Sequence, residues 1–150
     1  MRGWLLDTNV ISAATGPKPE PRLGKWFNSQ PEHRLFLSIL TLAEYRKGIE
    51  HLPRGDRMRP RLKQTVVALE TRFSGRILSV TDSIVLRWGA ISGEVKRLTG
   101  HSPSVIDTFL AATAIENELY LATRNTIHVA QSGAAIFNPW KDDPIKFPIV

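Results

Sequence analysis

Apolar and polar positions follow two different patterns along the chain. Short, nearly continuous apolar runs, such as residues 4–6 and 35–37, are typical of strands that are buried on both faces of a sheet. Between these runs, longer stretches repeat their apolar residues every three or four positions, which is the period of an amphipathic helix. Because the two kinds of stretch alternate, the pattern predicts an α/β fold with a central, mostly parallel sheet.

Breaks in the pattern define where the expected elements end. Proline and glycine interrupt it at residues 16–19, at 53–55 and at Gly100. The predicted strands cover residues 4–6, 35–38, 76–80, 120–123 and 134–137. Predicted helices cover residues 10–14, 21–29, 39–52, 61–73 and 82–99, and a further helix opens at 101–107. The proline-containing tail, residues 141–150, is expected to be poorly ordered.

Asp7 stands at the end of the first apolar run, directly before Thr8 and Asn9. Parallel sheets place their functional sites at the carboxyl ends of their strands, so Asp7 is a candidate catalytic residue. The same position also suits a helix cap, because a short polar side chain there accepts hydrogen bonds from free backbone amides. The local pattern leaves both interpretations open.

Glu44 and Asp107 carry a similar ambiguity. Glu44 lies about 140° around its predicted helix from the apolar stripe, which favours an exposed side chain. The apolar neighbours Leu40 and Ala43 leave a position in a cleft open. Asp107 follows Ser104 by three residues, the spacing of a capping box, so a purely structural role would explain it. Right-handed crossover connections would bring Asp7 and Glu44 to the same edge of the sheet.

Composition narrows the class of protein. A length of 150 residues fits a single domain, and the absence of cysteine excludes disulfide bonds and thiolate zinc sites. No apolar stretch approaches the roughly 18 residues of a membrane span, and the N-terminus lacks the pattern of a secretory signal. The chain is therefore expected to be a cytoplasmic protein without membrane contact.

Positive charge is concentrated in one segment of the chain. Residues 46–76 contain nine lysines and arginines and three acids, a net charge of +6 that equals the charge of the whole chain. Such a patch attracts nucleic-acid phosphates without sequence specificity, although a solvated helix face or a site for an acidic protein would also explain it. The candidate RNA-binding residues are Arg46, Lys47, Arg54, Arg57, Arg59, Arg61 and Lys63.

Four short segments together resemble one known family. They are LLDTNVIS at the start, LSILTLAEYRKGI around Glu44, IDTFLAATA around Asp107, and ATRN followed by AAIFNPW. In these segments the chain is similar to PIN-domain ribonucleases, in particular the VapC and FitB-like toxins of bacterial type II toxin-antitoxin pairs. Each segment is short, but four of them in family order over a chain of matching length form a specific pattern.

This resemblance implies a three-layer α/β/α sandwich that holds Mg²⁺ or Mn²⁺ with acidic residues at the C-terminal edge of its sheet. Carried over by motif, Asp7, Glu44 and Asp107 match three catalytic, metal-binding acids of the family. The polar residues that support them in the same motifs are Thr8, Asn9, Thr41, Thr123 and Asn125. Many relatives carry a fourth acid at or near the position of Asn125, so the number of ions stays open. Three acids suffice for one ion, because Mg²⁺ takes one or two carboxylates and keeps several waters.

The implied reaction is hydrolysis of RNA phosphodiester bonds by an endoribonuclease. Close carboxylates repel one another unless a cation lies among them, and a bound metal lowers the pKa of water for attack on phosphorus. Two alternatives stay open. A PIN domain that has lost the reaction and serves as an RNA- or protein-binding module would explain the missing fourth acid. A phosphatase with Asp7 as nucleophile fits less well, because it needs a second Asp where this chain has Asn9.

Partners follow from the same resemblance. Toxins of this family usually dimerise and are silenced by a small DNA-binding antitoxin, and the complex commonly binds its own promoter DNA. The resemblance therefore implies RNA as substrate, a homodimer, and a cognate antitoxin that forms a larger hetero-oligomer with it on DNA.

Overall fold

The computed structural model describes residues 1–150 and contains a five-stranded sheet in which every pair of neighbouring strands is parallel. The strand order is β3-β2-β1-β4-β5, so the first strand of the chain lies at the centre of the sheet. The strands are β1 (Trp4–Leu6), β2 (Leu35–Ser38), β3 (Ile77–Leu78), β4 (Tyr120–Ala122) and β5 (Ile136–Phe137). The predicted α/β fold is confirmed, and its sheet is parallel throughout.

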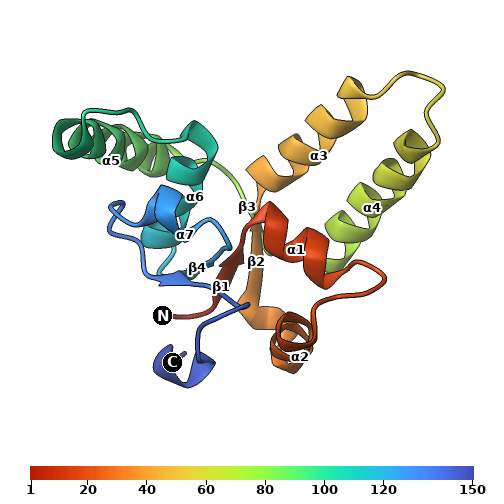
Figure 1. The fold of residues 1–150 in the computed structure, drawn as a ribbon, viewed down its shortest axis with the longest axis horizontal. Coiled ribbons are helices and arrows are strands. Elements are labelled where there is room, and N and C mark those ends of the chain that lie inside the picture. Colours follow the sequence, from red (N-terminus) through yellow and green to blue (C-terminus); the bar gives the residue numbers. More distant parts are fainter.

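Helices lie on both sides of this sheet (Figure 1). They are α1 (Thr8–Ala14), α2 (Pro21–Ser29), α3 (Ile39–His51), α4 (Met58–Arg72), α5 (Asp82–Thr99), α6 (Val105–Glu116) and α7 (Thr126–Val129), with short 3-10 helices η1 (Glu32–Arg34) and η2 (Pro144–Lys146). Helices α3 and α4 run side by side and project from the sheet as an arm, here called the α3–α4 arm (Figure 1). None of the helices has the length and apolar character needed to cross a membrane.

Side chains of β1 alternate between two buried layers. Trp4 and Leu6 pack in a cluster with residues of α1, α2 and the end of α4, whereas Leu5 packs with residues of α6 on the other face. Because β1 is covered on both faces, residues 4–6 are all apolar. The predicted three-layer arrangement follows from this double burial.

Several elements differ from prediction, among them α4, β3 and α7. Helix α4 begins at Met58, earlier than expected, and the carboxylate of Asp56, which precedes the N-cap residue Arg57, accepts a hydrogen bond from the Met58 amide at 2.8 Å. Strand β3 covers only Ile77 and Leu78, the residues that pair with β2. Helix α7 was not predicted, since a single turn is too short to show a helical period.

Helix α5 buries a narrower face than its sequence predicts. Ile84 and Ile91 are buried against α6, but Val85 and Leu98, apolar residues of the same helix, are 42% and 58% exposed. Among the helices α5 packs mainly against α6, so only the centre of its apolar stripe is covered.

The tail of the chain is packed, contrary to prediction. The ring of Phe147 lies 4.9 Å from that of Phe137 and 5.3 Å from that of Tyr120, measured between centroids. The Tyr120 hydroxyl also donates a hydrogen bond to the carbonyl of Pro148 at 3.0 Å. The free energy gained by packing these aromatic rings offsets the conformational entropy that the tail loses when it becomes ordered.

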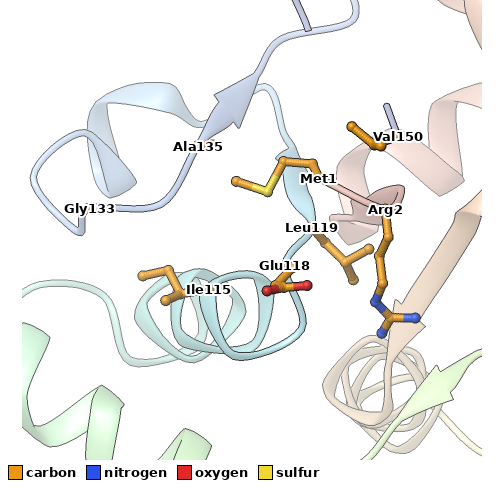
Figure 2. A pocket seen from close by; sticks show the side chains of 8 residues that line it. All are labelled: Met1, Arg2, Ile115, Glu118, Leu119, Gly133, Ala135 and Val150. Atoms are coloured by element: carbon orange, nitrogen blue, oxygen red, sulfur yellow. The ribbon is translucent and has the colours of Figure 1, made fainter. Parts of the chain in front are cut away.

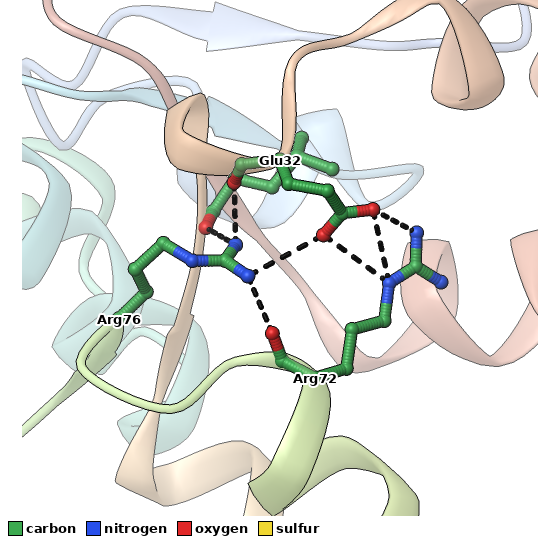
Figure 3. A network of polar contacts seen from close by, with 4 residues as sticks. Glu32, Arg72 and Arg76 are labelled. Carbon is green, nitrogen blue, oxygen red and sulfur yellow. Dashed lines mark hydrogen bonds and ion pairs between the residues drawn. The ribbon is translucent and has the colours of Figure 1, made fainter.

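An ion-pair network ties the end of α4 to the start of β2 (Figure 3). Glu32 accepts hydrogen bonds from Arg72 at 2.5 Å and from Arg76 at 3.3 Å. Arg76 also donates to the carbonyl of Leu35 at 2.6 Å, at the first residue of β2. The hydrogen bond from Arg72, and then the charges of Arg72 and Arg76, hold the pKa of Glu32 below its ordinary value of 4.5 against the opposing effect of partial burial.

Replacing Glu32 with glutamine should weaken the fold in a pH-dependent way. Near neutral pH we expect Glu32→Gln to lower the melting temperature by about 1–3 °C, since exposed ion pairs contribute up to roughly 1 kcal/mol and a domain of this size shifts by about 2–4 °C per kcal/mol. Because the folded pKa lies below the unfolded one, the stabilisation is present above pH 4.5 and is lost as pH falls through the folded pKa.

Thermal denaturation over a pH series measures this difference. The gap between wild type and Glu32→Gln should close in acid, and a gap that stays constant with pH would contradict the assignment. Glu94→Gln is the control, because Glu94 forms an exposed pair with Arg97 at 3.5 Å within one helix.

Gly3 marks a close approach between β1 and the segment before β2. A methyl group on Gly3 would lie 2.4 Å from the carbonyl oxygen of Arg34, which belongs to the backbone and cannot rotate away. We expect Gly3→Ala to lower the free energy of unfolding by about 1–3 kcal/mol through overpacking. Denaturant titration checks this against Gly93→Ala in α5, where the added methyl meets nothing within 4 Å and should stabilise the helix by about 0.5–1 kcal/mol. Equal behaviour of the two variants would refute the steric argument.

Candidate active site

Asp7 lies at the C-terminal end of β1 and is only 6% exposed. Its backbone amide donates to the carbonyl of Ala122 at 2.9 Å, so β4 fixes the chain at this point. Its Oδ1 accepts the amide of Thr8 at 2.6 Å, and its Oδ2 accepts the Thr123 hydroxyl at 2.7 Å and the Asn9 side-chain amide at 3.2 Å. Asp7 therefore does cap α1, and the same carboxylate lies where parallel sheets form their sites.

Glu44 is brought to the same edge through Thr8. The Thr8 hydroxyl lies 2.8 Å from Glu44 Oε1, to which it donates, and 3.3 Å from the hydroxyl of the buried Thr41. Glu44 is half-buried and lines a cavity of about 500 Å³ together with Lys47 of its own helix and Ile106 of α6. Of the two positions that the sequence left open for Glu44, the structure shows the one in a cleft, where Thr8 of α1 contacts its carboxylate.

Asp107 occupies the first turn of α6 and is half-buried. Ser104 caps this helix and accepts the Asp107 amide at 3.5 Å, so half of the predicted capping box is present. The Asp107 carboxylate makes no hydrogen bond back to Ser104. The side chain is therefore not used up by the structural role that its spacing allows.

Burial and charge both act on Asp7. Removal from water raises the pKa of its carboxyl, and the hydrogen bonds from Thr123 and the Thr8 amide oppose that rise. The negative charges of Asp107 and Glu44 raise the pKa of Asp7 further. A cation beside Asp7 would relieve the effect of these two negative charges on its buried carboxylate.

The donor set fits a hard divalent cation that keeps part of its water shell. All available side-chain donors are carboxylate, hydroxyl and amide oxygens, and Mg²⁺ binds oxygen through one or two carboxylates plus waters. In this structure no group of three or more acidic, histidine or cysteine side chains lies close enough together to hold an ion by direct bonds alone. Asp7 is the most buried of the three acids, and the negative charges of Glu44 and Asp107 act on it.

The segment that follows β4 supports Asp7 without adding an acid. Thr123 is buried, and its hydroxyl donates a hydrogen bond to Asp7. The backbone amide of Asn125 donates to the same hydroxyl at 3.0 Å. Asn9 accepts the backbone amide of Arg124 at 3.3 Å, which closes the link between β1 and β4. His128 is exposed on α7.

The candidate RNA-binding residues of the segment 46–76 divide into two groups. Arg59 is directed inward: it donates to the carbonyls of Ile49 and Leu52 at 2.7 and 2.9 Å, and its side chain is only 14% exposed. It joins the two helices of the α3–α4 arm and has few donors left for RNA. The remaining candidates are exposed on that arm: Arg46, Lys47, Arg54, Arg57, Arg61 and Lys63.

A cavity of about 480 Å³ lies at the opposite edge of the sheet (Figure 2). It is lined by residues that precede strands, including Arg2 before β1 and Leu119 before β4, whereas Asp7 and Thr123 follow those strands. This cavity is therefore separate from the acidic edge and belongs to the N-terminal side of the sheet.

Arg124 and Trp140 are neighbours of the site that were not predicted from the sequence. The guanidinium of Arg124 lies over the Trp140 ring, 5.0 Å from its centroid. The two residues are 16 positions apart and share no local motif. The only signal in the sequence is that an arginine and a tryptophan occur in two short segments, ATRN and FNPW, that follow one another along the chain.

Comparison with known proteins agrees with the observed fold. A PIN domain model matches residues 4–131. Toxin FitB of Neisseria gonorrhoeae is 36% identical over 141 residues, covering 92% of this chain and 99% of FitB. VapC ribonuclease Y4jK of Sinorhizobium fredii is 31% identical over 140 residues, covering 91% of this chain and 97% of that protein. The solved structure of FitAB bound to the IR36 DNA fragment superposes with a TM-score of 0.78 at 32% identity, covering 93% of this chain and 97% of that chain.

These matches extend over nearly the whole chain. The chain belongs to the PIN-domain family, and the resemblance seen in its four short segments is confirmed.

Proposed function

We propose that this chain is a divalent-metal-dependent endoribonuclease that acts in the cytoplasm as the toxin of a toxin-antitoxin pair. The observation that carries the proposal is the buried carboxylate of Asp7, which the charges of Asp107 and Glu44 surround at the C-terminal edge of the sheet. Membership of the PIN-domain family and likeness to proteins named toxin FitB and VapC ribonuclease support it.

Each acid takes a distinct role in this proposal. Asp7 and Asp107 would hold the cation directly or through water, and Glu44 would orient a water molecule or add a further ligand. When bound, the metal supplies a lowered pKa for water and neutralises charge that builds on the phosphoryl oxygens. Thr123 and Asn9 keep the Asp7 carboxylate in place, and Thr8 keeps Glu44 beside it.

The exposed cations of the α3–α4 arm would contact the RNA backbone. Lys47 lines the same cavity as Glu44, so a phosphate bound by the arm would lie next to the acidic edge. Arg59 is left out of this set because two carbonyls of α3 and its C-terminal turn occupy it.

Partners form the second half of the proposal. A homodimer, a small DNA-binding antitoxin, and a complex of both on promoter DNA are proposed from likeness to FitAB, which was solved bound to a DNA fragment. Co-purification of a small protein encoded next to this chain, together with loss of RNA cleavage when it is bound, would support the pairing.

The decisive test of the nuclease is cleavage of single-stranded RNA by the purified chain with Mg²⁺ or Mn²⁺, compared with excess chelator. Cleavage that requires the metal is the expected result. No cleavage with either metal would overturn it. That outcome would favour the alternative of an inactive PIN domain that binds RNA or protein, for which Asn125 in place of a fourth acid is the supporting observation.

A further inference from the structure

A second cavity, here called the Arg124 cavity, opens beside the acidic edge. Its volume is about 490 Å³, which is in the range of sites for small ligands. It lies between the turn after β4, helix α7 and the segment after β5. Its polar lining includes Arg124, Asn125, His128, Asn138, Trp140 and Lys141.

Arg124 is an exposed arginine that stacks on an aromatic ring and has no acidic partner. Its guanidinium lies 5.0 Å from the centroid of the Trp140 ring, and no carboxylate or carbonyl accepts a hydrogen bond from it. By contrast, Arg72 and Arg76 share Glu32, and Arg59 is bound by carbonyls. A guanidinium held by an aromatic ring keeps its planar fork of donors free for an anion, with little entropy left to lose.

Trp140 is itself held firmly. Its ring packs against the large core cluster, and its amide donates to the Asn138 side chain at 2.9 Å. The acid nearest to Trp140 in that segment is Asp142. Its carboxylate accepts a hydrogen bond from the backbone amide of Asn138 at 2.7 Å, and it does not line the cavity. Lys141 adds a further cation to the lining, so the cavity favours a negatively charged ligand.

The Arg124 cavity adjoins Asp7 through the chain itself. Thr123 donates to Asp7 at 2.7 Å, and the next residue is Arg124, whose amide donates to Asn9 at 3.3 Å. The Arg124 side chain therefore starts one residue from a direct hydrogen-bond partner of Asp7. The turn that carries Arg124 is thus joined to both Asp7 and Asn9 by hydrogen bonds.

We propose that Arg124 binds a backbone phosphate of the RNA strand close to the bond that is cut, and that Trp140 is the positioning residue for its guanidinium. This inference rests on the proposed function, because it names a substrate contact of the same site. It assigns RNA contacts to the side of the acidic edge opposite the α3–α4 arm. The strand would then be held from both sides of Asp7.

Binding of a fluorescent single-stranded RNA, followed by anisotropy at several salt concentrations, tests the proposal. The protein is Asp7→Asn with chelator present, so that cleavage does not interfere. Adding Arg124→Ala should weaken binding by about 10-fold across RNA sequences and reduce the salt slope by about 0.7, the value for one lost phosphate contact on a single strand. Arg124→Ala keeps the backbone amide that bonds to Asn9.

Arg97→Ala is the matched control, because it also removes one exposed positive charge but lies on α5. It should leave both the affinity and the salt slope unchanged. If Arg124→Ala behaves like Arg97→Ala, or if the protein binds no RNA at all, the proposal is overturned. Arg124→Ala that leaves RNA binding intact but weakens binding of an antitoxin would overturn it in favour of a protein-docking site.

The role of Trp140 is tested by a double-mutant comparison. Trp140→Leu should weaken RNA binding a few-fold in the parent protein and have no further effect once Arg124 is alanine. Additive losses would contradict a positioning role. If Trp140→Leu lowers the melting temperature so far that the protein unfolds, the result with the exposed Arg124 still decides the proposal.

Binding and cleavage fail separately in this design. Loss of RNA affinity in Arg124→Ala without metal-dependent cleavage by the wild type would support the phosphate contact and contradict the nuclease. Metal-dependent cleavage by the wild type, together with an RNA affinity that Arg124→Ala does not change, would support the nuclease and contradict the phosphate contact.

Discussion

Asp7→Asn is expected to reduce metal-dependent RNA cleavage by at least about 100-fold, since even the partners that merely orient metal ligands contribute roughly 10–100-fold. Asparagine has the shape of aspartate and can still accept the Thr8 amide, so α1 keeps its cap. It loses the charge and one of the two oxygens, and with them its value as a ligand for a hard cation. Initial cleavage rates with Mg²⁺ or Mn²⁺ measure the effect.

Asp82→Asn is the matched control for this variant. Asp82 is exposed in the first turn of α5, so its removal should leave the rate unchanged. Equal rates for wild type and Asp7→Asn would mean that a contaminating nuclease cuts the RNA, and the proposed role of Asp7 would be abandoned.

Addition of Mg²⁺ or Mn²⁺ is expected to raise the melting temperature of the wild type. A ligand at about 100 times its Kd stabilises the folded state by about 2.7 kcal/mol, which corresponds to roughly 5–10 °C for a domain of this size. The physical reason is that a bound cation would offset the negative charges of Glu44 and Asp107 that act on the buried Asp7 carboxylate. Excess chelator should reverse the shift.

Thermal scans of Asp7→Asn provide the comparison for that stabilisation. The variant should show little shift with the same metal, and sodium at equal ionic strength should shift neither protein. A shift of equal size in Asp7→Asn would place the bound metal elsewhere on the molecule.

The fold was largely predictable because the burial of each strand and helix leaves a pattern in its own stretch of sequence. Double burial of the central strand makes residues 4–6 and 35–37 continuous apolar runs, and helical stripes between them are equally plain in the sequence. The tail was mispredicted because its order comes from the packing of Phe147 on Tyr120 and Phe137. These partners lie outside the tail, so the local sequence does not indicate the contact.

The candidate site was predictable only in part, for the same physical reason. Asp7 follows from its strand end, but the place of Glu44 depends on Thr8, which is 36 residues away. Net charge identified the basic segment, yet it did not distinguish Arg59, which holds two helices together, from its exposed neighbours. Residue type reports chemistry, whereas only the tertiary contacts decide which side chains are free to use it.

The central position of β1 has a consequence for how an active protein is made. β1 is synthesised first, but its neighbour β4 and the Thr123 hydroxyl that holds Asp7 come 116 residues later. Pairing between such distant segments cannot begin until both have left the ribosome. The surroundings of Asp7 are therefore completed late in synthesis, and a nascent chain that ends before β4 lacks both the neighbouring strand and the Thr123 hydroxyl. If Asp7 acts as proposed, the chain would gain its activity only near the end of translation.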